Sequence, residues 1–105
     1  MGLIMTAERI PAEKGLALGF VNEVATPANF DATIDRWCAQ ILRCAPLAIA
    51  ASKEAVLRGL DEPSLADALT RQSAYPAFAR HQQSADAEEG PKAFAEKRDP
   101  VWQGR

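Results

Sequence analysis

The sequence has few of the side chains from which catalytic and metal sites are usually built. It contains one histidine, His81, and two cysteines, Cys38 and Cys44. Zinc sites need paired cysteine or histidine spacings that are missing here. His81 stands alone among polar neighbours, so it supports no nucleophilic triad and is expected at the surface. The tightest carboxylate pair, Glu88 and Glu89, would point about 100° apart on a helix and is expected to form a solvated helix start. We therefore predict no catalytic residue and no metal ligand.

Basic charge and long apolar stretches are also lacking. The formal net charge is −2, which gives no reason to expect nucleic acid or an anionic membrane as a partner. No apolar stretch approaches the roughly 20 residues that span a membrane, and the first residues lack a signal-peptide pattern. We expect a cytoplasmic protein. Its cysteines should be reduced, small core residues, because their spacing places them on different faces of a helix.

Alanine is the commonest residue, at 21 positions, whereas β-branched residues are sparse. This composition favours helices, because alanine loses no side-chain entropy in a helix. Hydrophobic residues make up 48% of the chain, which is enough for a core, although a domain of this size has a thin stability margin. We expect one all-α domain over residues 1–105 with four to five helices.

Proline and glycine divide the chain into five helical segments with a short extended run, residues 20–24, that has no partner strand. Pro76 predicts a kink or an early end within one segment. Ser84 should cap the last segment, and Gly90-Pro91 should break it into two short pieces. The expected segments are residues 12–18, 28–44, 46–60, 64–80 and 84–98.

The clearest amphipathic pattern lies in residues 28–44. Its apolar side chains recur at i, i+4, i+7, i+8, i+11 and i+12, which is one stripe at helical period. We therefore expect Trp37, in the middle of the stripe, to lie in the core. The stripe consists of Phe30, Ile34, Trp37, Cys38, Ile41 and Leu42.

Three stretches together resemble the enoyl-CoA hydratase/isomerase (crotonase) family. Residues 3–24 read LIMTAERIPAEKGLALGFVNEV, similar to the family pattern T-G/A-x-x-I-x-A-x-x-A-x-x-x-G-L-V-N-x-V. Residues 45–56, APLAIAASKEAV, are similar to the A-P-x-A helix with its lysine. Residues 84–105, SADAEEGPKAFAEKRDPVWQGR, resemble the ending S-x-D-x-x-E-G-x-x-A-F-x-E-K-R-x-P-x-F/W-x-G. The resemblance covers essentially the whole chain and identifies it as the family's C-terminal helical portion.

Three positions depart from the family pattern. Gly15 stands where alanine is usual, Phe20 where leucine is usual, and Pro91 where a larger apolar residue is usual. We expect Pro91 to weaken the last helix.

The resemblance implies a role in acyl-CoA metabolism. Family members polarise the carbonyl of a CoA thioester, their substrate, with an oxyanion hole and acidic groups on an N-terminal ββα-spiral domain. That domain is expected to be absent here, so the chain alone should not catalyse the reaction and should hold no covalent cofactor. Matching family positions imply that Phe78 and Lys97 contact the adenine and phosphate end of CoA. The alternatives are a core anchor for Phe78 and a solvated charge for Lys97; for Trp102 we expect packing of the tail.

Two functions follow from these expectations. The first is a part of a crotonase-type enzyme that contributes oligomer contacts and weak contacts to the edge of CoA. The second is a stand-alone helical protein-interaction module without CoA affinity. Self-association to a dimer or trimer is expected, because helices on so short a chain should leave apolar faces exposed. The apolar residues expected to take part are Leu16, Leu18, Leu65 and Leu69.

Overall fold

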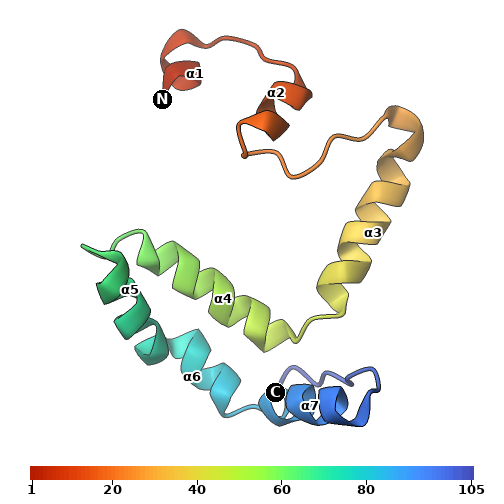
Figure 1. Ribbon diagram of the computed structural model, residues 1–105, viewed down its shortest axis with the longest axis vertical. Helices are drawn as coiled ribbons and strands as arrows, with labels where there is room; N and C mark the ends of the chain where they lie inside the picture. Colours follow the sequence, from red (N-terminus) through yellow and green to blue (C-terminus); the bar gives the residue numbers. More distant parts are fainter. The chain divides into compact units, whose positions relative to one another are not determined.

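The computed structural model describes residues 1–105, which form α-helices, two short 3-10 helices and no strand (Figure 1). The all-α class is therefore confirmed. None of the helices combines the length and apolar character that crossing a membrane would require. The elements are α1 (Gly2–Thr6), α2 (Ala12–Ala17), η1 (Pro27–Asn29), α3 (Phe30–Leu42), α4 (Pro46–Gly59), α5 (Leu65–Arg71), η2 (Gln72–Ala74), α6 (Pro76–Gln82) and α7 (Ala85–Glu96).

The chain divides into two compact units, Met1–Trp37 and Cys38–Arg105, with the boundary inside α3. In the first unit, Gly19 follows the end of α2 with φ 83°, the left-handed conformation that glycine commonly adopts after a helix. Gly15 is buried against the segment that follows. A Cβ atom there would lie 2.8 Å from Val21 Cγ2 and 3.1 Å from the Phe20 ring. Gly15 and Phe20, which both depart from the family pattern, are therefore in contact.

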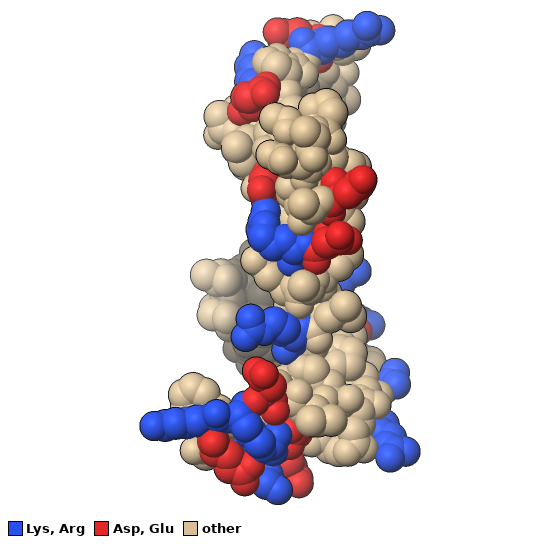
Figure 2. Space-filling view, turned by 90° about the vertical axis from the view of Figure 1, so that its right-hand side faces the viewer, with Lys and Arg blue, Asp and Glu red and all other residues tan.

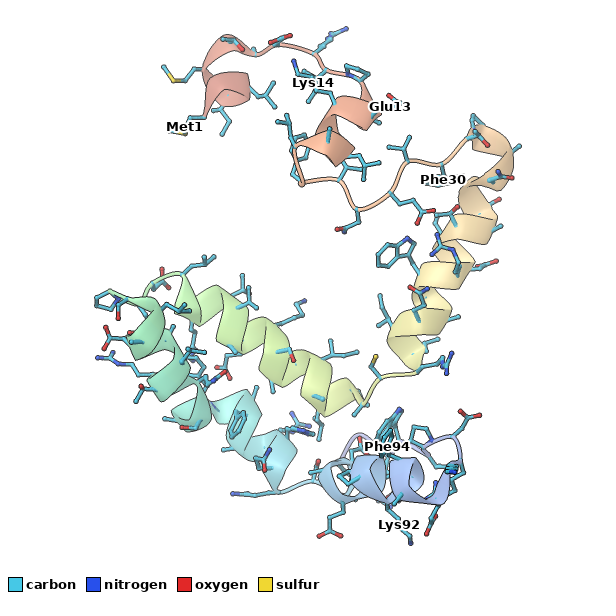
Figure 3. The ribbon with its side chains drawn as sticks, in the orientation of Figure 1. Met1, Glu13, Lys14, Phe30, Lys92 and Phe94 are labelled. Carbon is cyan, nitrogen blue, oxygen red and sulfur yellow. The ribbon has the colours of Figure 1, made fainter.

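Helix α3 confirms the predicted helix but not its burial. No residue of α3 is buried: Trp37 is 37% exposed and Leu42 is 78% exposed. Phe30 projects from the first turn (Figure 3) and is also exposed. The indole N–H of Trp37 donates to the carboxylate of Glu23 at 2.8 Å. The prediction that Trp37 lies in the core is therefore wrong, because an apolar stripe is buried only where another element covers it.

In the second unit, α4 and α6 pack against each other. Leu47 and Ala51 of α4 and Tyr75, just before α6, form most of the buried core. The N-terminus of α6 has no cap of its own. Instead, the Glu54 carboxylate on α4 accepts the N–H of Ala77 at 2.7 Å. The first backbone N–H groups of a helix have no partner within the helix, and here a side chain of another helix binds one of them.

The segment predicted as one helix over residues 64–80 is two helices. Tyr75 is extended, with φ −72° and ψ 140°, because Pro76 disfavours the helical conformation in the residue before it. The early end predicted at Pro76 is therefore confirmed. Ser64 caps α5 by accepting the N–H of Asp67 at 3.1 Å.

Two predictions about burial are wrong. Cys38 and Cys44 are both free and exposed; Cys38 belongs to the uncovered stripe of α3. His81 is half-buried rather than at the surface, and its Nδ1 atom is buried without a hydrogen-bond partner. In both cases the local sequence does not reveal whether another element covers the side chain.

Helix α7 continues through Gly90-Pro91, so the predicted break does not occur. Ser84 caps its start, as predicted, and accepts the N–H of Ala87 at 3.2 Å. Proline lacks an N–H and crowds the carbonyl four residues earlier, which usually costs about 3 kcal/mol in a helix interior. The contacts that offset this cost come from the residues after the helix, which fold back onto α7.

Candidate functional site

The C-terminal tail is anchored to the first turn of α7. Asp86 is only 2% exposed, and its carboxylate accepts the backbone N–H groups of Gln103 at 2.7 Å and Gly104 at 2.9 Å. The N–H of Ala85 donates to the carbonyl of Arg105 at 2.8 Å. A buried carboxylate needs such partners, since an unpaired buried charge is costly.

A second anchor lies one turn further along α7. Arg98 donates to both carboxylate oxygens of Glu89, at 2.6 and 2.9 Å, and the N–H of Val101 donates to Glu89 at 2.8 Å. Chiefly the Arg98 bond, and then the Val101 bond, lower the pKa of Glu89 to about 2. The expectation that Glu89 is simply a solvated residue of the helix start is therefore wrong. In the space-filling view, acidic and basic side chains lie side by side around α7 (Figure 2).

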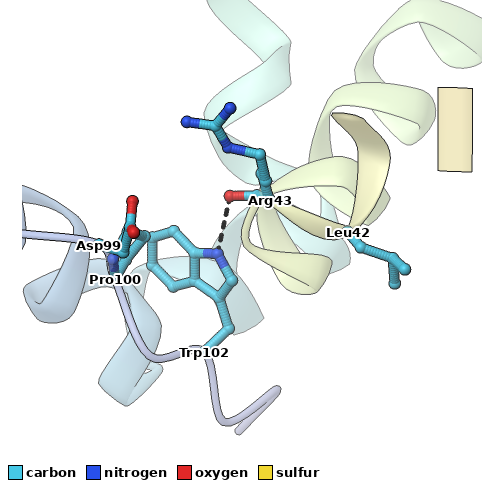
Figure 4. A pocket seen from close by; sticks show the side chains of 5 residues that line it. All are labelled: Leu42, Arg43, Asp99, Pro100 and Trp102. Carbon is cyan, nitrogen blue, oxygen red and sulfur yellow. Dashed lines mark hydrogen bonds between the residues drawn. The ribbon is translucent and has the colours of Figure 1, made fainter. Parts of the chain in front are cut away.

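Trp102 forms the third anchor. Its ring lies against Gly90, where an added Cβ would be 3.5 Å away. Its indole N–H donates to the carbonyl of Arg43 at 2.9 Å, which joins the tail to the end of α3 (Figure 4). The expected packing of the tail through Trp102 is confirmed. Asp86, Glu89, Arg98 and Trp102 are called the tail clasp below.

A shallow hollow lies beside the third anchor. It is lined by Leu42 and Arg43 from α3 and its end, and by Asp99, Pro100 and Trp102 from the tail (Figure 4). Its volume is about 510 Å³. The hollow is open and its walls include both a guanidinium and a carboxylate, so its chemistry selects no single ligand class.

Lys97 follows α7 in the left-handed conformation, with φ 54° and ψ 40°. Its N–H donates to the carbonyl of Phe94 at 3.2 Å, and the N–H of Arg98 donates to the carbonyl of Ala93 at 3.1 Å. These two bonds are the Schellman motif, in which glycine usually occupies the position of Lys97. The side chain of Lys97 is exposed and makes no salt bridge.

Phe78 lies in α6 and is half-buried. No cation–π contact joins Phe78 to Lys97, and the contact of both residues with CoA that the resemblance implies stays a prediction. Sequence reasoning also overlooked Phe94, which is 87% exposed and three residues before Lys97. Lys92 and Phe94 point to different sides of α7 (Figure 3). The signal was available, because the A-F-x-E-K-R pattern places this aromatic three residues before the lysine.

No three acidic, histidine or cysteine side chains lie close enough together to hold a metal ion. The acidic residues with well-defined partners serve the fold: Asp86 and Glu89 hold the tail, and Glu54 caps α6. The second unit also carries exposed cations, among them Lys92 and Lys97, and exposed aromatic and aliphatic side chains.

Comparisons with known proteins agree in one family. Residues 1–105 match the family described as Enoyl-CoA hydratase/isomerase. A carnitinyl-CoA dehydratase from Escherichia coli strain K12 is 41% identical over 105 residues, which are 98% of this chain and 40% of that protein. A putative short chain enoyl-CoA hydratase from Novosphingobium aromaticivorans has a TM-score of 0.87 and 36% identity over 99% of this chain and 40% of its own. An enoyl-CoA hydratase from Mycobacterium marinum has a TM-score of 0.83 and 37% identity, covering 100% of this chain and 40% of its own. The chain thus spans about 40% of the length of these relatives.

Proposed function

Because the chain belongs to the enoyl-CoA hydratase/isomerase family, we propose that it is the C-terminal helical portion of an enzyme of acyl-CoA metabolism. The observation that carries this proposal is the tail clasp. The stretch that resembles the family's C-terminal ending, residues 84–105, forms a helix with an attached tail, and the motif acids Asp86 and Glu89 are the groups that attach it. The motif therefore has a physical purpose in this chain, which chance resemblance would not provide.

We assign this portion a supporting role without catalysis of its own. Catalysis by the family needs donors aimed at the thioester oxygen and an acid or base near the substrate, and the acids with defined partners here stabilise the fold. The purified chain should not hydrate a short enoyl-CoA in a spectrophotometric assay. Turnover well above buffer that disappears in a variant of this chain would overturn the assignment.

The chain also provides surfaces for association with further copies, as a dimer or trimer. Leu16 and Leu18 are exposed on the first unit, and Leu65 and Leu69 are exposed on the second. Exposed apolar side chains of this kind are typical of interaction surfaces. Sedimentation over a hundredfold range of concentration should reveal a dimer or trimer. A strict monomer throughout would contradict this part of the proposal.

Contact with the edge of CoA depends on Lys97 for the phosphates and on Phe78 for the adenine. Stacking on an aromatic ring contributes roughly 1–3 kcal/mol, and an exposed ion pair contributes about 0.2–1 kcal/mol. The sum is at most about 4 kcal/mol, so the dissociation constant should be on the order of 1 mM. Affinity this weak fits a site completed by the remainder of a longer enzyme.

A chemical-shift titration with CoA, and with pantetheine as the ligand lacking phosphates, tests this contact. Phe78→Ala and Lys97→Ala should each weaken binding of CoA, and pantetheine should bind less well than CoA. Phe94→Ala is the matched aromatic variant: if it removes binding and Phe78→Ala does not, the adenine contact belongs to Phe94. Equal binding of both ligands would overturn the phosphate contact.

A helical interaction module without CoA affinity is the second candidate. The uncovered stripe of α3 favours it, because five large apolar side chains of one helix are exposed. The same titration separates the candidates, since the module should show no shift with CoA at any accessible concentration. The exposed side chains are Phe30, Ile34, Trp37, Ile41 and Leu42.

A further inference from the structure

Lys97 occupies a backbone conformation that a lysine rarely adopts. Its φ of 54° is left-handed, and a side chain with a Cβ atom is less stable there than glycine. It also takes the Schellman position where glycine is the usual residue. Strained residues of this kind persist where the surrounding structure fixes them, and they gather at functional sites. The position therefore raises two questions: what holds it, and why a lysine is there.

The residues on both sides of Lys97 are tied together and to α7. Arg98 donates from Nε to the carboxylate of Glu96 at 2.6 Å, which closes a bridge across Lys97. The other end of the guanidinium binds both oxygens of Glu89, and Arg98 also donates to the carbonyl of Asp99 at 3.1 Å. With its two neighbours fixed, the backbone between them has little freedom to leave the left-handed conformation.

The same bonds determine which cation forms salt bridges with Glu89 and Glu96. Glu89 and Glu96 are both bound by Arg98, and Lys97 makes no salt bridge although it lies next to Glu96 in the chain. A planar guanidinium binds carboxylates through two parallel bonds, which a lysine ammonium cannot do. Arg98 thus pairs with both acids, and the Lys97 ammonium remains without a salt bridge.

We propose that Glu89 and Arg98 are positioning residues for Lys97: they fix its left-handed backbone and leave its ammonium unpaired for an anionic group of a ligand. The inference rests on the proposed contact with CoA, whose phosphates are the anion in question. It adds to that contact the reason why the cation is available. Neither positioning residue touches the ligand; both act through Lys97.

The first test compares stability with affinity at Lys97 itself. Lys97→Gly removes the unfavourable Cβ at a left-handed position, so the melting temperature of the chain should rise by a few degrees. The same change should weaken CoA binding up to about fivefold, the value of an exposed ion pair. Lys92→Ala, which removes an exposed lysine within α7, should leave affinity nearly unchanged. A Lys97→Gly variant that is less stable and binds CoA as well as the parent overturns the proposal.

The second test concerns the positioning residues. Arg98→Gln releases both acids, so CoA affinity should fall about as far as in Lys97→Gly, and the HN–Hα coupling of Lys97 should leave its left-handed value. Glu89→Gln, which keeps an oxygen for Val101, should have a smaller effect in the same direction. Arg98→Lys keeps the positive charge but cannot bind a carboxylate through two parallel hydrogen bonds. Its affinity for CoA should therefore lie between those of Arg98→Gln and the parent chain. Parental affinity and coupling in Arg98→Gln would overturn the proposal.

The two proposals fail in different ways. If the parent chain does not bind CoA at all, the proposed contact with CoA fails. The positioning by Glu89 and Arg98 is then decided by the Lys97 coupling alone, which needs no ligand. Loss of the left-handed coupling in Arg98→Gln supports the positioning, and an unchanged coupling refutes it.

Discussion

Replacing Asp86 by alanine should detach the C-terminal tail from α7. Its carboxylate is almost fully buried and accepts two backbone N–H groups of the tail. Hydrogen bonds to a charged group contribute about 1.5–3 kcal/mol each. The full sum is not lost, because both N–H groups regain water when the tail leaves. We expect the free energy of unfolding to fall by about 2–4 kcal/mol. The free energy of unfolding of a folded chain is typically about 5–15 kcal/mol.

Thermal unfolding followed by circular dichroism measures this loss as a fall of roughly 10–20 °C in Tm. Hydrogen exchange shows where it arises: the amides of Gln103 and Gly104 should lose protection before those of α4 and α6. Asp86→Asn should recover part of the stability, because the amide oxygen can accept one N–H while the amide NH2 group faces the other donor.

Glu88→Ala is the matched control, since Glu88 is an exposed acid in the same turn of α7. It should cost only the few tenths of a kcal/mol to about 1 kcal/mol that an acid near a helix N-terminus contributes. If Asp86→Ala costs no more than Glu88→Ala, or if exchange at Gln103 and Gly104 is unchanged, the two hydrogen bonds do not hold the tail. The reasoning behind the tail clasp would then be refuted.

Two further perturbations test other contacts. The pKa of Glu89 is about 2 in the folded chain and 4.5 in its reference state. Its stabilising effect is therefore complete above about pH 4.5 and should be lost as the pH falls toward 2. Hydrogen exchange should show this as a loss of tail protection in the parent chain, and Glu89→Gln should show no such loss between these pH values. Gly15→Ala should destabilise the first unit in thermal unfolding, because the new Cβ meets Phe20 and Val21 at 3.1 and 2.8 Å, and Phe20→Leu should restore part of the loss. Simple additivity of the Gly15→Ala and Phe20→Leu effects would contradict their coupling.

Helix boundaries set by proline and glycine could be predicted from the sequence, because their steric effects are local. Gly19 adopts the left-handed conformation expected after α2, α4 begins at Pro46, and Tyr75 leaves the helix before Pro76. The exception is Gly90-Pro91, where α7 continues. There the decisive contacts come from Trp102 and the other tail residues, and no local pattern of residues reveals such contacts.

Burial was less predictable than helicity. The period of the stripe on α3 identified which residues share a face, but periodicity says nothing about what covers that face. Trp37 and Cys38 therefore belong to the predicted stripe and are nevertheless exposed. The roles of Asp86 and Glu89 were missed for a related reason: acids in the first turns of a helix are favourable there in any case, which leaves no local sign that they also bind a distant tail.

The motif at the end of the chain separates into residues with an internal role and residues without one. Ser84 caps α7, the acids and Arg98 hold the tail, and Gly90 makes room for Trp102. Lys97 and Phe94 remain: one is an unpaired cation in a conformation better suited to glycine, and the other is almost fully exposed. Stability explains the first group, so substitutions there should alter folding and binding together. Stability does not explain the second group, and glycine at position 97 would make the chain more stable than lysine does. The proposed contact with a ligand or partner outside this chain would account for residues of the second kind. This is why the stability of Lys97→Gly and its affinity for CoA are expected to change in opposite directions.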